Sequence, residues 1–297
     1  MSKTYNIRKL QKQSFSSQKE VPKYYLSYCK EKINTQNPNT NGWINIIKTL
    51  KMPLEDYDKS RILLAKLEHH KDIVVKIGDD DSIRREYEYG KKLYKIKGVV
   101  KFICYFECND DFLKYPDKER NHLCNGEGSR MKIIAMPYFE LGSIGSYEWN
   151  LDNIHVLRTC IKHAIMTNIS AFMHGFLHGD FHPGNILLKK TKQSSIDYLF
   201  EEIGEVNIET NGVRTWIMDF ENTREISAEN PRDIMDFYFD IQKFFTLLQD
   251  HRFIKNIDKS TNINIFQLVN KYMNSLRYPD MDFIMGIIDS IDKIAVI

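Results

Sequence analysis

The chain has 297 residues, 42% of them hydrophobic and 12% aromatic, and these values exclude a disordered chain. The net charge of +2 gives no argument for nucleic acid or a membrane as partner, and no window approaches the roughly 20 apolar residues of a membrane span. Five cysteines, an odd number without paired spacing, predict reduced thiols in a soluble, intracellular and cytoplasmic protein.

Residues 1–42 are polar and end in a turn-prone run rich in asparagine, which predicts a partly ordered leader. From Trp43 the pattern changes to short β-branched and apolar runs at 44–47, 61–67 and 72–77. These runs predict three strands, the last of which carries Lys76 near its end.

Residues 82–96 are charged and have helical spacing, with Ser82 as the expected N-cap. Glu86 and Glu88 are both candidates for the glutamate with which Lys76 would pair according to the family resemblance described below. We prefer Glu86, because Leu93 then falls two turns later on the same face of the helix.

A further strand is expected at 101–106 and another from Met131, the second running into a connector that ends near Gly142. Apolar residues at three-to-four spacing predict a long helix over 153–174. Gly175 ends it.

The centre of the chain is residues 177–188, which read Leu-His-Gly-Asp-Phe-His-Pro-Gly-Asn-Ile-Leu-Leu. A second acidic run, Trp-Ile-Met-Asp-Phe-Glu, follows at 216–221. Phosphoryl transfer from ATP requires a carboxylate to orient the attacking hydroxyl, and an amide with a second carboxylate to hold Mg²⁺. Asp180, Asn185 and Asp219 supply these groups in that order.

The connection between Lys189 and Arg214 contains an apolar patch, Ile196 with residues 198–200, for which we expect a surface helix. Residues 236–248 form a strongly apolar helix pattern that contains Asp240. Two or three packing helices are expected after it.

The two motifs resemble the protein-kinase-like superfamily, whose catalytic loop reads His-x-Asp-x-x-x-x-Asn and whose metal motif begins Asp-Phe. The resemblance implies that Asp180 is the catalytic base and that Asn185 and Asp219 are the Mg²⁺ ligands. It also implies that Lys76 contacts the α- and β-phosphates of ATP and that Glu86 orients Lys76.

The same resemblance implies an α+β, two-lobed kinase-like fold: a small antiparallel sheet lobe at 43–139 and a larger, mostly helical lobe at 140–297. Between them, Met136 would guard the back of the adenine pocket, and the backbone of Pro137 and Phe139 would face the adenine edge. Asp240 is similar to the buried aspartate that anchors the catalytic loop in this superfamily.

Three features depart from the pattern of serine/threonine protein kinases. No glycine occurs between Gly42 and Gly78, so the glycine-rich phosphate loop is absent as a motif. Glu221 replaces the glycine that follows Asp-Phe. His182 stands where those kinases usually carry lysine, and His-Gly-Asp-x-His-Pro-Gly-Asn is similar to the aminoglycoside and choline phosphotransferases.

These features leave three functions in view. The first is a serine/threonine protein kinase, because the region after Asp219 resembles the divergent kinases of large DNA viruses; a viral source would place the protein in host cytoplasm or virion. The second is a small-molecule kinase acting on a hydroxyl compound, which an acidic pocket in the C-terminal helices would favour. The third is a pseudokinase scaffold without activity.

Overall fold

A computed structural model describes residues 44–51, 60–67, 72–111, 123–124, 128–201, 203–227, 230–249 and 259–294 of the chain. The predicted leader at 1–42 lies outside the described residues. So does the segment 52–59, within the stretch in which a glycine-rich loop was sought.

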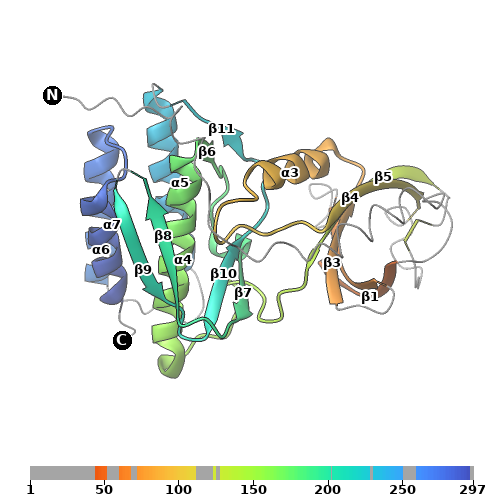
Figure 1. Ribbon diagram of the computed structural model, residues 1–297, viewed down its shortest axis with the longest axis horizontal. Coiled ribbons are helices and arrows are strands. Elements are labelled where there is room, and N and C mark those ends of the chain that lie inside the picture. The colour runs from red at the N-terminus through yellow and green to blue at the C-terminus, as the bar shows by residue number, and fades with distance from the viewer. Residues whose placement is uncertain are drawn as a thin grey trace. The chain divides into compact units, whose positions relative to one another are not determined.

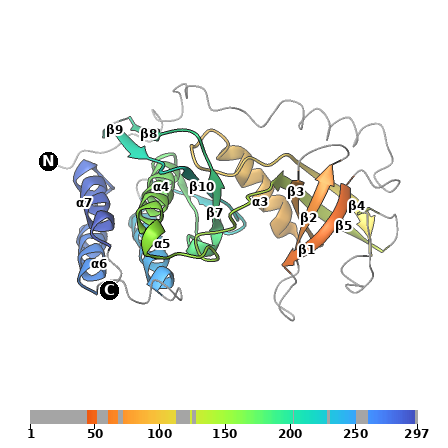
Figure 2. The same ribbon diagram turned by 90° about the horizontal axis from the view of Figure 1, so that it is seen from below.

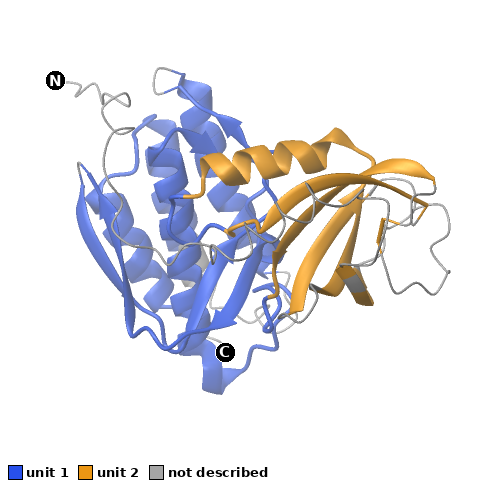
Figure 3. Cartoon of the chain, turned by 45° about the vertical axis from the view of Figure 1, so that its right-hand side comes forward, with its two compact units in different colours: residues 1–15, 95–99, 139–297 blue, residues 16–94, 100–138 orange. Residues whose placement is uncertain are grey.

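The chain divides into two compact units (Figure 3). The sheet unit holds the described residues up to Tyr94 and those of Val100–Tyr138. The helical unit holds Lys95–Val99 and the described residues from Phe139 onward.

The sheet unit contains a five-stranded antiparallel sheet in the order β1-β2-β3-β5-β4 and one helix (Figure 1). Its elements are β1 (Ile44–Lys51), β2 (Ser60–Leu67), β3 (Asp72–Gly78), α3 (Asp81–Lys92), β4 (Cys104–Asp110) and β5 (Ser129–Pro137). The predicted strands in this part of the chain are therefore present.

Aliphatic side chains with almost no exposure form the core of this sheet, among them Leu63, Val75, Ile77, Ile133 and Ala135. β-branched residues suit such a pleated, buried surface. They fix the register of β3, because a shift by one residue would expose the whole set.

Helix α3 begins one residue earlier than predicted, and its N-cap is Asp80 instead of Ser82. The Asp80 carboxylate accepts a hydrogen bond from the backbone N–H of Ser82 at 2.8 Å. A carboxylate is favoured here because it meets the partial positive charge of the helix N-terminus. The helix ends at Lys92, short of the predicted Ile96.

Helices dominate the other unit, and short strand pairs flank them (Figures 1 and 2). Helix α5 packs on α6, and α7 packs on both α6 and α4. The elements are α4 (Ile154–Met173), β6 (Phe176–Leu177), β7 (Ile186–Lys190), β8 (Ser195–Phe200), β9 (Gly204–Glu209), β10 (Val213–Ile217), β11 (Arg224–Glu225), α5 (Pro231–Gln249), α6 (Lys259–Asn274) and α7 (Met281–Asp292). The predicted α+β class, with a small antiparallel sheet and a larger, mostly helical part, is confirmed.

The surface helix expected around Ile196 is wrong, because this segment forms the hairpin β8–β9. Ile196, Tyr198 and Phe200 alternate along β8 and are buried, while Leu199 between them is 69% exposed. This period of two is the pattern of a half-buried strand. The sequence of this segment is too short to distinguish a period of two from a helical period. The packing of β8 against α4 decides which of its side chains are buried.

The prediction of reduced thiols is wrong for Cys108 and Cys124, which form a disulfide with a Cα–Cα distance of 5.4 Å. The Asp110 carboxylate accepts the backbone N–H of Cys124 at 2.7 Å and so holds this residue beside the end of β4. The two cysteines are 16 positions apart, and only the return of the chain makes them neighbours. Cysteine usage therefore no longer supports an intracellular location.

In the part of the chain that the structure describes, no helix combines the length and the apolar character that a membrane crossing needs.

Candidate active site

The strand pair β7–β10 brings the two sequence motifs together inside the helical unit. Ile217, near the end of the second motif, faces Ile186 in the antiparallel register. One step further, the backbone N–H of Met218 donates to the carbonyl of Asn185 at 3.0 Å. Asp219 is thereby placed next to the loop that carries Asp180, although 39 positions separate them in the sequence.

Hydrogen bonds from His178 and Asn185 shape the loop around Asp180. His178 Nε2 donates to the carbonyl of Met218 at 3.0 Å, and His178 Nδ1 accepts the backbone N–H of Asp180 at 3.2 Å. A carbonyl can only accept, so the imidazole carries its proton on Nε2. Asn185 Nδ2 donates to the carbonyl of Asp180 at 3.1 Å. His178 is therefore a structural member of the loop, joining both motifs.

Two residues of this site have left-handed backbone conformations. Gly179 has φ +79°, and a Cβ at this position would lie 2.4 Å from the carbonyl oxygen of Asn222. Only glycine satisfies both conditions. Asp219 has φ +66°, a conformation that aspartate tolerates better than most residues and that is concentrated at functional sites.

Asp240 on α5 supports the loop from its buried side, as the sequence predicted. Its Oδ2 accepts the backbone N–H of Gly179 at 2.8 Å. Burial raises the pKa of Asp240, and the neighbouring His178 and the backbone N–H groups of Gly179 and Phe181 oppose that rise. The aspartate thus anchors the backbone on both sides of Asp180.

Buried aromatic rings fix the loop on the core. The His178 ring meets the edges of Phe181 and Phe220 at centroid distances of 6.1 and 5.7 Å. Phe181 stacks on Phe244 of α5 at 4.8 Å. Stacked and edge-on pairs of this kind add to the burial energy of the rings, so both motifs are held by the same apolar cluster.

Two basic side chains contact the carboxylate of Asp180. Lys243 on α5 forms an ion pair with Oδ1, and His182 Nε2 lies 3.7 Å from Oδ2. Burial acts to raise the pKa of Asp180, but the hydrogen bond from Lys243 and the nearby positive charges outweigh it and hold this pKa below its ordinary value. Asp180 is therefore ionised at neutral pH.

Lys243 is the residue of this site that the sequence interpretation missed. It follows Asp240 by three positions, which is close to one helical turn. Because Asp240 was expected to face the catalytic loop, the helical period alone places Lys243 on the same face.

In the sheet unit, Lys76 on β3 donates to Glu86 Oε2 on α3 at 2.8 Å. The two side chains are 6% and 0% exposed. The choice of Glu86 over Glu88 as the partner is confirmed for this contact, since Glu88 is half exposed and pairs with Lys91. The part that the pair plays toward a nucleotide stays a prediction.

The three residues expected around an adenine ring lie in the sequence on either side of the point where the sheet unit ends and the helical unit resumes. Met136, buried near the end of β5, and Pro137 belong to the sheet unit. Phe139 belongs to the helical unit and packs against Trp216 at a centroid distance of 5.3 Å. Proline has no backbone N–H, so Pro137 offers only its carbonyl to a ligand.

Asn185 and Asp219 provide oxygen donors of the kind that Mg²⁺ prefers. Because Asn185 uses its side-chain N–H₂ toward Asp180, its side-chain oxygen is the atom that remains for a cation. Among the described residues, no cluster of three or more His, Cys, Asp or Glu side chains could hold a metal. If Asn185 and Asp219 held a Mg²⁺ ion, phosphate and water would have to supply its other ligands, as is common for this ion.

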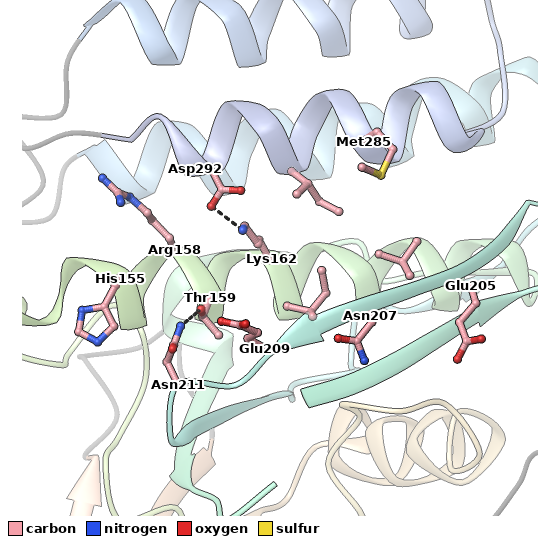
Figure 4. A pocket seen from close by; sticks show the side chains of 13 residues that line it. His155, Arg158, Thr159, Lys162, Glu205, Asn207, Glu209, Asn211, Met285 and Asp292 are labelled. Atoms are coloured by element: carbon pink, nitrogen blue, oxygen red, sulfur yellow. Dashed lines mark hydrogen bonds and ion pairs between the residues drawn. The ribbon is translucent and has the colours of Figure 1, made fainter. Parts of the chain in front are cut away.

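A cavity of about 480 Å³ lies elsewhere in the helical unit, between α4, β9 and α7 (Figure 4). Its charged lining has both signs: Arg158, Lys162, Glu205, Glu209 and Asp292. Lys162 and Asp292 pair across it at 2.5 Å. None of the predicted site residues lines this cavity.

No protein-family model and no curated protein matches the chain. Among solved structures, the chain is similar to the Rio2 kinase of Chaetomium thermophilum, in its ADP/Mg²⁺–phosphoaspartate complex, with 16% sequence identity and a TM-score of 0.43. The similarity covers 69% of this chain and 56% of that one, so the chain spans little more than half the length of that kinase.

Proposed function

We propose that the chain is an ATP-dependent phosphotransferase with a protein-kinase-like fold, which transfers the γ-phosphoryl group to a hydroxyl. One observation carries this proposal: the hydrogen-bond chain from Asn185 to Asp180 and from Met218 to Asn185 holds a carboxylate, an amide and a second carboxylate in one unit. Each of these three residue types has a defined task in phosphoryl transfer.

In this proposal the helical unit supplies the acceptor side of the reaction. Asp180 is ionised and part-exposed, so it orients the acceptor hydroxyl and receives its proton. Asn185 and Asp219 hold Mg²⁺, which when bound neutralises charge on the phosphates.

The sheet unit supplies the nucleotide side. Lys76 binds the α- and β-phosphates, and the buried carboxylate of Glu86 keeps the lysine side chain in one orientation. Met136 and Pro137 of this unit border the adenine.

We propose serine or threonine of a protein as the acceptor. Phe239 is 48% exposed on α5 and lies one turn before Lys243, the lysine that contacts Asp180. An exposed aromatic residue one turn from the lysine that contacts the catalytic carboxylate suits a polypeptide better than a small polar compound.

A small hydroxyl compound is the second candidate, and the approach of His182 to Asp180 favours it. The acidic pocket that would strengthen this alternative is not the cavity beside α7, because that lining carries both signs of charge.

The test measures ATP consumption and label transfer by the purified chain with Mg²⁺, using a basic and an acidic protein as acceptors. Asp219→Asn removes the charged ligand while asparagine tolerates the left-handed backbone, and we expect turnover to fall by at least about 10²-fold. Asp289→Asn, an identical change at an exposed position of α7, should behave like the wild type.

Label on serine or threonine, lost in Asp219→Asn, would establish a protein kinase. Turnover that depends on Asp219 without protein labelling would direct the search to small hydroxyl compounds. Nucleotide binding without turnover would overturn the phosphotransferase and favour the pseudokinase scaffold. The absence of both nucleotide binding and turnover would overturn the proposal as a whole.

A further inference from the structure

We infer that Lys243 is a positioning residue, which fixes the direction of the Asp180 carboxylate toward the acceptor hydroxyl. The inference rests on the proposed function and adds to it a residue outside both sequence motifs. Its basis is the ion pair between Lys243 Nζ and Asp180 Oδ1.

Helix α5 contacts two successive residues of the loop through groups of opposite charge. Asp240 accepts the backbone N–H of Gly179, and Lys243, three residues later, donates to the side chain of Asp180. The helix therefore determines both the path of the backbone and the direction of the carboxylate. A rigid helix is a better support for such geometry than a loop.

The second oxygen of Asp180 faces His182. The His182 Nδ1 atom accepts the backbone N–H of Gly184 at 3.1 Å, so the proton of the neutral ring is on Nε2, the atom 3.7 Å from Asp180 Oδ2. The contact from Lys243 is much the shorter of the two. Without Lys243, rotation of the carboxylate would be restrained by the distant imidazole alone.

The ion pair between Lys243 and Asp180 is expected to contribute little to folding stability, so an effect on catalysis can be distinguished from an effect on folding. Lys243 is 46% exposed and Asp180 26%, and pairs of this exposure contribute little to folding because solvent screens them. A change at Lys243 should therefore alter catalysis far more than it alters unfolding. If Lys243 had only a structural role, its replacement would alter unfolding more than catalysis.

The experiment compares Lys243→Met, which keeps most of the side-chain length without the charge, with Lys243→Arg, which keeps the charge. Lys271→Met is the matched control on the exposed surface of α6. We expect Lys243→Met to lower kcat by about 10²-fold. The KM for ATP should change less than about twofold, because Lys243 acts through Asp180 and not on the nucleotide. Lys243→Arg should recover most of the loss.

A double variant tests whether Lys243 acts through Asp180. In an Asp180→Asn background the carboxylate is gone, so adding Lys243→Met should cost less than about twofold in the residual rate. A full and additive loss in that background would show that Lys243 acts independently and would overturn the inference.

The remaining outcomes separate the two proposals. A wild-type chain without ATP turnover would overturn the proposed function and the role of Lys243 together. An active wild type with Lys243→Met as active as Lys271→Met would overturn the role of Lys243 alone. A fall of more than about 5 °C in the melting temperature of Lys243→Met would show a structural role and overturn it too.

Discussion

The Lys76–Glu86 ion pair places one full charge of each sign inside the sheet unit, with almost no exposure of either side chain. Removing both charges from water is costly, and the pair offsets this cost only while both partners are present. Loss of one partner removes this ion pair from a charge that stays buried. Such a pair is therefore sensitive to single substitutions in a way that exposed pairs are not.

Glu86→Ala is expected to lower the free energy of unfolding of the sheet unit by about 3 kcal/mol, because it removes the ion pair from the buried Lys76 ammonium. Glu88→Ala, two residues away on the same helix, should cost less than about 0.5 kcal/mol, since Glu88 is exposed and forms only a weak pair with Lys91. Unfolding in urea, monitored by hydrogen exchange of the β3 amides, measures the loss of stability in each variant. Equal costs would mean that the buried pair does not stabilise this unit.

At the scale of elements, His163 joins helix α4 to the β8–β9 hairpin. Its Nδ1 lies 2.9 Å from the hydroxyl of Tyr198, and its Nε2 lies 3.0 Å from the carbonyl of Glu209. The carbonyl accepts, so Nε2 carries the proton and Nδ1 accepts from Tyr198. Burial lowers the pKa of His163 to about 4, although the bond to Glu209 opposes this.

This lowered pKa predicts loss of stability in mild acid. The unfolded histidine binds a proton as the pH falls through 6.5, whereas the folded one does so only near pH 4. The unfolded state therefore binds more protons across this window, and up to about 3 kcal/mol is lost as the pH falls.

His163→Gln removes the titrating group, so between pH 7 and 4.5 this variant should lose roughly 2 kcal/mol less than the wild type. His155→Gln, at an exposed position on the same helix, should follow the wild type. Chemical denaturation at the two pH values gives the comparison. Parallel losses in all three proteins would contradict a buried neutral histidine.

At the scale of the whole molecule, the chain forms two units with separate cores, and a covalent link occurs within one of them. The Cys108–Cys124 disulfide closes a 16-residue separation in the sheet unit. A crosslink of this length removes conformational freedom from the unfolded chain. Its effect should be confined to the unit that contains it.

Replacement of both cysteines by serine is expected to lower the stability of the sheet unit by about 3 kcal/mol. Hydrogen exchange should become faster in β4 and β5 but stay unchanged in α4. The buried Cys160 of α4 provides the control, because Cys160→Ser alters a cysteine of the other unit. Faster exchange in both units after the double replacement would show that they do not unfold separately.

Local patterns were sufficient for most elements of the fold. The β-branched runs of the sheet and the apolar spacing of α4 and α5 each contain their own period, so the elements follow from neighbouring residues. The prediction of a helix around Ile196 was wrong, because the six residues of this segment fit a helix or a strand equally well when the buried face is not known. The cysteine pair failed because a disulfide depends on distance in space.

By itself, the sequence determined which residue types stand in the two motifs, and hence the prediction of Asp180, Asn185, Asp219 and the Lys76–Glu86 pair. Spacing along the chain was enough to recognise each motif because each is local, and the resemblance to the kinase-like superfamily implied the Lys76–Glu86 pair. Only the tertiary structure decided that Lys243 contacts Asp180, that His163 joins a helix to a hairpin, and that Cys108 meets Cys124. These contacts join positions distant in the chain, and packing of the elements, which no local pattern encodes, makes them neighbours.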